Sequence, residues 1–189
     1  MRALLHALDR WVSEGVEPPS SRFPSRAEGT LVTPDPAGMS FPSIPKLTYN
    51  GRVNGLRVTD YSVRPPKEGK AYPVFVPKVD ADGNDAAGIQ MSAVAVPRAT
   101  YLGWNYRRDG FAEGELCLNT GSYIPFAQTR VEREASGDPR LSIEERYPTH
   151  DAYVEKVKET VNRLLEDRLL LEEDAKRIVE RAKQSPISN

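Results

Sequence analysis

The sequence predicts an α+β fold, with an irregular proline-rich body of extended loops and short strands, an amphipathic N-terminal helix and a C-terminal helical hairpin. Twelve of the 16 prolines fall between Pro18 and Pro97, where an average sequence would have ~5% proline. Helical periodicity of hydrophobic residues is confined to the two ends of the 189-residue chain. We therefore expect one region, residues 1–189, with a helix over 1–15, a loop-rich body over 16–140 and a helical tail over 141–185.

The N-terminal helix is predicted from an apolar stripe. At 100° per residue one face carries Leu4, Leu5, Leu8, Trp11 and Val12. Gly15 supplies a stop, and Pro18 prevents the helix from resuming. No capping side chain precedes the pattern, which fits two alternatives equally: a chain cut from a longer protein, or a frayed first turn.

The body offers only short strand candidates between its prolines. They are Leu56–Tyr61, Val74–Val76 and Ala93–Val96. Apolar and aromatic side chains such as Phe41 and Tyr49 recur throughout, whereas disordered segments usually lack them. We expect extended loops that lie over a surface and are anchored by these side chains.

The tail carries three helix signals. Ser142 and Glu145 have the spacing of a capping box, which predicts a short helix. Thr149 can cap the next helix, which carries an apolar stripe of Tyr153, Val157, Val161, Leu164 and Leu165. A last helix carries Ala175, Ile178, Val179 and Ala182. The last two helices are expected to pair as an antiparallel hairpin.

Composition argues against several function classes. The chain has 26 basic and 27 acidic side chains, net charge −1, so it lacks the basic excess of a nucleic-acid-binding protein. One cysteine forms no intramolecular disulfide, and one cysteine with two histidines argues against a zinc site. No apolar run approaches the ~20 residues of a membrane span. His6, Asp9 and Arg10 interrupt any signal sequence. We expect no cofactor and assign no compartment; cytoplasmic is the default.

The acidic segment Asp80-Ala-Asp82-Gly-Asn84-Asp85 is the first candidate for chemistry. An EF-hand loop needs Gly at position six and Glu at position twelve. Counting from Asp80, those positions hold Asp85 and Met91. A polar turn is therefore favoured, ahead of a functional polar loop and, last, a metal site.

Nucleophilic catalysis has no credible residues. The G-x-S-x-G elbow of serine hydrolases does not occur. His6 falls on the polar face of its helix and His150 in a helix first turn, where solvent-exposed or capping roles are favoured. Cys117 has only the acidic neighbours Glu113 and Glu115, which would raise its pKa. We assign no catalytic residue.

Residues 101–108 interleave aromatic side chains with arginines, as in surfaces that stack on single-stranded nucleic acid. Because no basic groove accompanies them, core packing with an arginine-aromatic rim is favoured. The lining of an organic-substrate pocket by Trp104 and Asn105 remains the alternative.

Five segments carry a family resemblance: residues 6–22, 79–89, 99–107, 121–127 and 138–147. The second reads Val-Asp-Ala-Asp-Gly-Asn-Asp and the third reads Ala-Thr-Tyr-Leu-Gly-Trp-Asn-Tyr-Arg. In this order, from Leu4 to Arg181, they resemble the C-terminal region of the bacterial alpha/beta hydrolase domain family. The resemblance implies a longer protein whose serine elbow and catalytic histidine lie upstream of the first helix.

This resemblance leads to two expectations about function. The chain is expected to be the C-terminal segment of a serine hydrolase of the ester or amide class, inactive alone and completing or covering a hydrolase core. Its partner is expected to be that core, on the same or a separate chain, or a second copy of this chain. Family members can be exported. The alternative is a stand-alone binding module derived from the hydrolase tail. Residues expected to line a pocket are Asp80, Asp82, Asn84, Asp85, Trp104 and Asn105.

Overall fold

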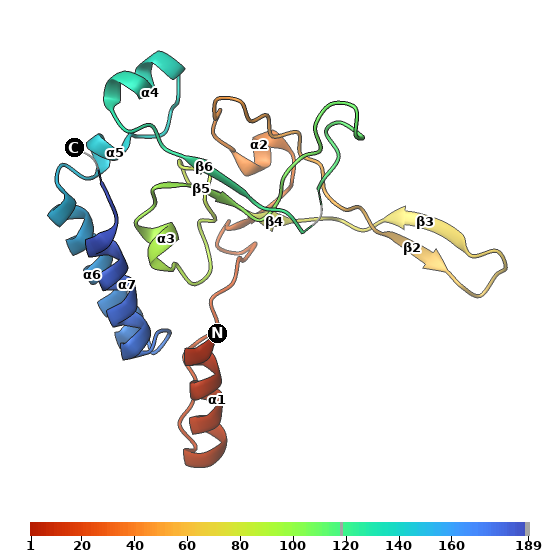
Figure 1. The fold of residues 1–189 in the computed structure, drawn as a ribbon. Coiled ribbons are helices and arrows are strands. Elements are labelled where there is room, and N and C mark those ends of the chain that lie inside the picture. The colour runs from red at the N-terminus through yellow and green to blue at the C-terminus, as the bar shows by residue number, and fades with distance from the viewer. Residues whose placement is uncertain (118, 188–189) are drawn as a thin grey trace.

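The computed structural model describes residues 1–117 and 119–187, and it confirms a mixed α+β fold with helices at both ends (Figure 1). The helices are α1 (Arg2–Glu14), α2 (Pro36–Met39), α3 (Ser92–Ala95), α4 (Arg130–Ser136), α5 (Ile143–Arg146), α6 (His150–Glu166) and α7 (Glu172–Gln184). The strands are β1 (Leu31–Val32), β2 (Arg57–Asp60), β3 (Lys67–Ala71), β4 (Val76–Pro77), β5 (Ala99–Leu102) and β6 (Ser122–Pro125).

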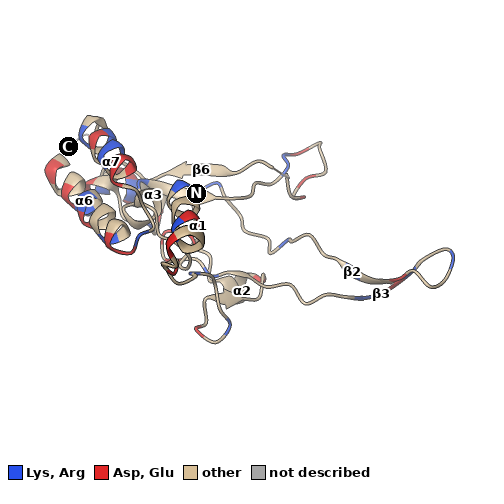
Figure 2. Ribbon diagram, turned by 90° about the horizontal axis from the view of Figure 1, so that it is seen from below, with Lys and Arg blue, Asp and Glu red and all other residues tan. Residues whose placement is uncertain are grey.

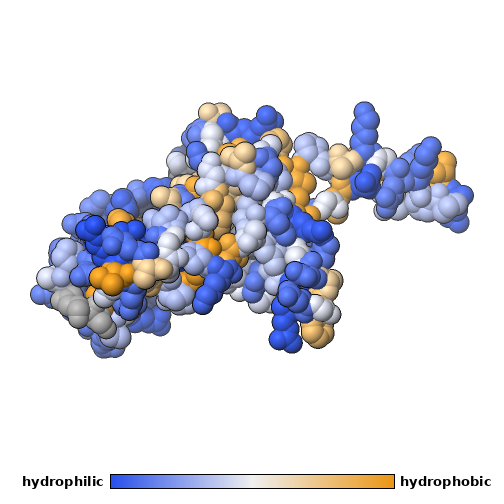
Figure 3. Space-filling view, turned by 90° about the horizontal axis from the view of Figure 1, so that it is seen from above, coloured by the Kyte–Doolittle hydropathy of each residue, from blue (hydrophilic) through white to orange (hydrophobic). Residues whose placement is uncertain are grey.

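The strands of the described residues form three separate two-stranded antiparallel ladders, β1 with β4, β2 with β3 and β5 with β6. Strand β5 is almost entirely buried, and Thr100 pairs with Ile124 at its centre. The β2–β3 ladder projects from the body as an arm (Figures 1 and 2). Hydrophilic residues dominate the surface of this arm, with isolated hydrophobic side chains among them (Figure 3).

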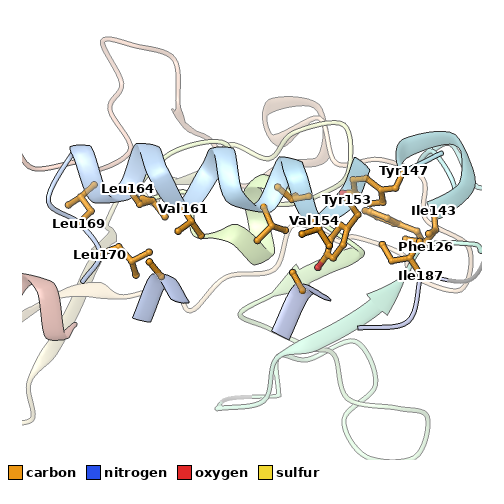
Figure 4. Packing of buried hydrophobic residues seen from close by; sticks show 14 residues of the cluster. Phe126, Ile143, Tyr147, Tyr153, Val154, Val161, Leu164, Leu169, Leu170 and Ile187 are labelled. Carbon is orange, nitrogen blue, oxygen red and sulfur yellow. The ribbon is translucent and has the colours of Figure 1, made fainter. Parts of the chain in front are cut away.

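The main core lies along the helical hairpin of α6 and α7. Val157, Val161 and Leu164 are each 2% exposed on the inner face of α6. Tyr147, Tyr153 and Phe126 extend the cluster towards α5 and the end of β6 (Figure 4). Acidic and basic residues are interspersed along both helices (Figure 2). The apolar stripe predicted for the tail is therefore the face that the fold buries.

The helix starts follow the predicted capping chemistry. The Thr149 hydroxyl accepts a hydrogen bond from the Ala152 N–H at 3.1 Å. Ser142 and Glu145 form the reciprocal capping box that opens α5. A second capping box, Thr129 with Glu132, opens α4. That helix was not predicted, although Thr129 and Glu132 have the same spacing as Ser142 and Glu145.

Glu145 yields a prediction about pH. Hydrogen bonds from the Ser142 N–H (2.9 Å) and hydroxyl (2.7 Å), with the Arg133 guanidinium beside them, lower the pKa of Glu145 to about 2. Because the folded-state pKa is lowered, this stabilisation is present above the usual pKa of 4.5 and is lost as pH falls towards 2. We expect the Glu145 carboxyl carbon to titrate near the lower value by NMR, and Arg133→Gln to raise that midpoint. Lys156→Gln, an exposed change on α6, should leave it unchanged; a midpoint near the usual value in the parent chain contradicts the prediction.

One predicted strand is wrong. Residues Ala93–Val96 were expected to be extended, but Ser92–Ala95 form the single helical turn α3. The N–H groups of Val94 and Ala95 both donate to the Met91 carbonyl, at 2.9 Å each. A four-residue apolar run does not distinguish a strand from a buried helical turn, and here packing against α6 favours the turn.

Helix α1 is amphipathic, as predicted, but the side that it buries is narrow. Ala3 and Ala7 are buried, on the side that faces the loop between α6 and α7. The Arg2 guanidinium pairs with Glu173 and Asp174 at the start of α7. The apolar stripe itself faces outward: Leu4 is 41%, Leu5 60%, Leu8 50%, Trp11 52% and Val12 81% exposed. The strongest apolar pattern of the N-terminal half thus stays largely exposed.

Candidate functional site

The predicted polar loop is a tightly hydrogen-bonded turn. One Asp80 carboxylate oxygen accepts the N–H groups of Asp82 (2.9 Å) and Asn84 (3.0 Å). The Asp80 N–H donates back to the Asn84 carbonyl at 2.8 Å. Gly83 has φ +77°, and a Cβ at that position would meet the Thr100 side chain at 3.0 Å. The loop therefore needs glycine both for its backbone and for its close approach to β5.

Asn84 fixes the loop to the edge of β5. Its side chain is fully buried. The amide nitrogen donates to the Ala99 carbonyl at 3.1 Å, and the amide oxygen accepts the Tyr101 N–H at 2.7 Å. The amide thus imitates one residue of a neighbouring strand, and its hydrogen-bonding groups are used within the fold.

Asp82 is held by an ion pair with Arg146 of α5. Both side chains are 14% exposed. Arg146 binds the two carboxylate oxygens with two guanidinium nitrogens, one of them at 2.8 Å. The guanidinium also lies 4.2 Å from the centroid of the Phe126 ring. Bidentate pairing of this kind fixes orientation as well as charge, so it anchors the loop to the helical tail.

A second, more deeply buried ion pair, between Arg140 and Asp138, is connected to the loop through Thr100. Arg140 and Asp138 have side chains only 2% and 7% exposed. Arg140 also donates to the Thr100 hydroxyl at 2.8 Å, and that hydroxyl donates to the Asp82 carbonyl. Sequence reasoning missed Asp138, Arg140 and Thr100, because two charged residues around Pro139 resemble an exposed turn.

An apolar and aromatic cavity also borders this loop. The cavity has a volume of about 370 Å³ and is lined by residues from α2, the β4 region, the polar loop and β5. Its wall includes Asp85, Tyr49, Trp104 and several valines. Tyr101 also contributes to the wall, but its ring packs against Tyr123. Clefts of this size and apolar character are typical of small-molecule sites.

Of the six residues predicted to line a pocket, Asp85 and Trp104 lie on the wall of this cavity. Asp80, Asp82 and Asn84 hold the loop through the hydrogen bonds above. The Asn105 side-chain oxygen accepts the Tyr106 N–H at 2.8 Å, in the turn that follows Trp104. Contact between the six predicted residues and the active site of a hydrolase core stays a prediction.

The carboxyls at the loop have altered acidity. Burial is the main cause that raises the pKa of Asp80, whereas the hydrogen bonds from the Asn84 and Asp82 N–H groups act to lower it. Burial also raises the pKa of Asp85, and the negative charge of Asp80 raises it further. Both effects disfavour the charged form of the Asp85 carboxyl, and a cation beside it would oppose them.

Nucleophile and base candidates remain apart. His150 Nε2 lies 3.1 Å from the Ala182 carbonyl oxygen in the helical hairpin. His6 lies against the α6–α7 loop, and Cys117 is a half-buried free thiol. Residues 1–117 and 119–187 contain no group of three or more His, Cys, Asp or Glu residues placed to hold a metal ion. Nor does any helix within those ranges have the length and hydrophobicity to cross a membrane.

Comparison with known proteins gives one match. A family model described as "Alpha/beta hydrolase domain" matches residues 1–180. Searches of curated proteins and of solved structures found no match.

Proposed function

The chain belongs to the alpha/beta hydrolase domain family, and from this premise we propose that it is the C-terminal segment of a serine hydrolase that acts on esters or amides. In this proposal the segment covers and completes a hydrolase core that carries the nucleophile, and it is inactive alone. Its polar loop and the Trp104 turn would face the reaction site in the assembled enzyme.

The observation that carries the proposal is the exposed apolar face of α1. Five large apolar side chains lie on it, and Trp11 remains 52% exposed. Monomeric soluble proteins rarely expose contiguous apolar patches beyond a few hundred Å². Family membership favours a hydrolase core as the partner of this face, because a hydrolase fold buries its sheet under amphipathic helices.

The arm formed by β2 and β3 supports the same proposal. An isolated two-stranded hairpin is marginal in water, and no other helix or strand makes more than weak contact with this one among the described residues. Tyr61 at its tip is 78% exposed, and Leu56 and Tyr72 at its base are 69% and 52% exposed. An arm of this shape gains stability by lying along a second surface.

The chemistry of the chain is consistent with an accessory role. A serine nucleophile needs a base within hydrogen-bond reach and an elbow that exposes it. The sequence contains no G-x-S-x-G, His150 lies against the Ala182 carbonyl in the helical hairpin, and His6 is exposed on α1.

We expect the full chain alone to give no serine-dependent labelling by a fluorophosphonate probe and no turnover of a p-nitrophenyl ester. The physical reason is the lack of an activated nucleophile. A labelled serine whose replacement by alanine abolishes the signal would overturn the proposal.

Docking is tested by coexpression with a hydrolase core encoded upstream. Leu8→Glu places a charge in the apolar face of α1 and should abolish copurification with that core. Ser13→Glu introduces the same charge on the opposite, polar face and should leave it intact. Equal binding by both variants would show that α1 is not the docking face.

The alternative is a stand-alone binding module derived from a hydrolase tail. The observation in its favour is the aromatic cavity, which is formed within this chain. Inspection of the DNA upstream separates the two: an in-frame or adjacent segment with G-x-S-x-G supports the hydrolase, and its absence supports the module.

A further inference from the structure

We propose that the cavity beside the polar loop binds a small organic cation, an ammonium group attached to an apolar body. The juxtaposition that carries this proposal is a carboxylate that has no basic partner among the described residues, beside the aromatic side chains of Tyr49 and Trp104 on an apolar wall. The proposal concerns a site formed within this chain, so it holds or fails independently of docking to a hydrolase core.

The aromatic walls come from separate parts of the chain. Tyr49 precedes the arm, whereas Trp104 lies in the turn that follows β5. Tyr49 and Trp104 pack against each other with ring centroids 5.6 Å apart. Electron-rich ring faces attract cations, and aromatic cages are the usual sites for quaternary ammonium groups.

The carboxylate is Asp85. It pairs with Val79 in an isolated antiparallel bridge, and side chains of directly opposed residues lie on the same face of a ladder. Val79 is 5% exposed and lines the cavity. The bridge therefore places Asp85, an exposed residue, on the wall of the cavity.

The charges around Asp85 favour a cation. Among the described residues it takes part in no ion pair, and Asp80 adds a second negative charge nearby. Arg52 is the basic residue on the cavity wall, but its guanidinium pairs with Glu115. Arg146 is likewise held by Asp82. An incoming ammonium group would supply the missing counter-charge, while the valines of the wall accommodate an apolar body.

The test uses the full chain and three probes of similar size in isothermal titration calorimetry near neutral pH. The probes are benzyltrimethylammonium, neutral N-benzylacetamide and anionic phenylacetate. We expect saturable binding of the cation at least about tenfold tighter than of the neutral probe, and no binding of the anion. Equal affinity for the cation and the neutral probe, or no binding of the cation, overturns the proposal.

Variants locate the site. Asp85→Asn should weaken cation binding about tenfold or more, while Asp85→Glu retains much of it. Asp151→Asn removes an exposed carboxylate from α6, a helix that contributes no residue to the cavity wall, and is the matched control. Unchanged affinity in Asp85→Asn overturns the proposal.

A measurement on the parent chain guards against a variant that fails to fold. The indole NMR resonance of Trp104, assigned with Trp104→Phe, should shift on titration with the cation, while that of Trp11 stays fixed. A shift confined to Trp11 would place the cation on α1 and overturn the proposal.

Discussion

Replacement of Arg140 by methionine should lower the free energy of unfolding by about 3–5 kcal/mol, because it leaves a buried carboxylate without its counter-charge. The guanidinium contacts Asp138 through two nitrogens, at 2.9 and 2.6 Å. Both side chains are more than nine-tenths buried. A surface ion pair, in contrast, contributes little because water and salt screen it.

The loss should extend beyond the pair itself. Arg140 also donates to the Ile124 carbonyl of β6 at 3.1 Å and to the Thr100 hydroxyl of β5 at 2.8 Å. One side chain thus joins the two strands, and through Thr100 it reaches the polar loop. We expect Arg140→Met to weaken cation binding in the neighbouring cavity as well, since Asn84 and Asp85 depend on that loop.

The dependence on pH gives this prediction a specific signature. Burial alone would raise the pKa of Asp138, but the hydrogen bonds and the charge of Arg140 outweigh it and lower that pKa. The stabilisation is therefore present above the usual pKa of 3.8 and is lost as pH falls through the folded-state value. In the variant, protonation removes the unpaired charge, so the difference between parent and variant should shrink in acid.

Urea denaturation followed by circular dichroism at neutral pH and near pH 3 measures both effects. Arg130→Met is the matched control, because Arg130 is 68% exposed and pairs only with Glu134, one helical turn away. Arg130→Met should leave the urea midpoint of unfolding nearly unchanged. Equal shifts in the two variants would show that the Asp138–Arg140 pair does not contribute as a buried pair.

The ends of the chain were the predictable part of the fold. Helices α5 and α6 begin where Ser142 and Thr149 supply caps, and the α6 stripe is the buried face. These signals are local: caps and apolar spacing act within one or two turns. Prediction failed where distant contacts decide the structure, as in α3, which α6 holds as a helical turn.

The apolar face of α1 illustrates a different limit. The sequence correctly indicated the helix and its stripe, but a stripe does not specify which surface covers it. Ala3 and Ala7, rather than the leucines, are the buried contacts. The stripe therefore became informative only when the structure showed it exposed.

The candidate site was predictable in composition but not in role. Asp80, Asp82 and Asn84 form a polar loop as expected, yet their hydrogen-bonding groups are directed at the backbone, at Arg146 and at β5. Asp85 differs because its bridge to Val79 places it at the cavity. Acidic residues of one loop thus acquire different roles, Asp82 through its pair with the distant Arg146 and Asp85 through a local bridge.

Replacement of Leu164 by alanine should cost about 2–5 kcal/mol of the free energy of unfolding, the range for truncating a buried leucine. Leu164 is 2% exposed in the hairpin core, near Leu169 and Leu170 (Figure 4). The cost combines lost apolar burial with the cavity left behind, which the ends of α6 and α7 cannot close without moving the turn between them.

Leu5→Ala is the matched control, because it makes the same truncation on the face of α1 that is 60% exposed at this residue. Urea denaturation of the isolated chain should show a large shift of the midpoint for Leu164→Ala and almost none for Leu5→Ala. In a binding assay with a hydrolase core, by contrast, Leu5→Ala should weaken binding, because the partner buries that side chain. A large loss of stability from Leu5→Ala in the isolated chain would mean that the chain itself already covers this face, most directly by self-association, and the docking proposal would lose its main observation.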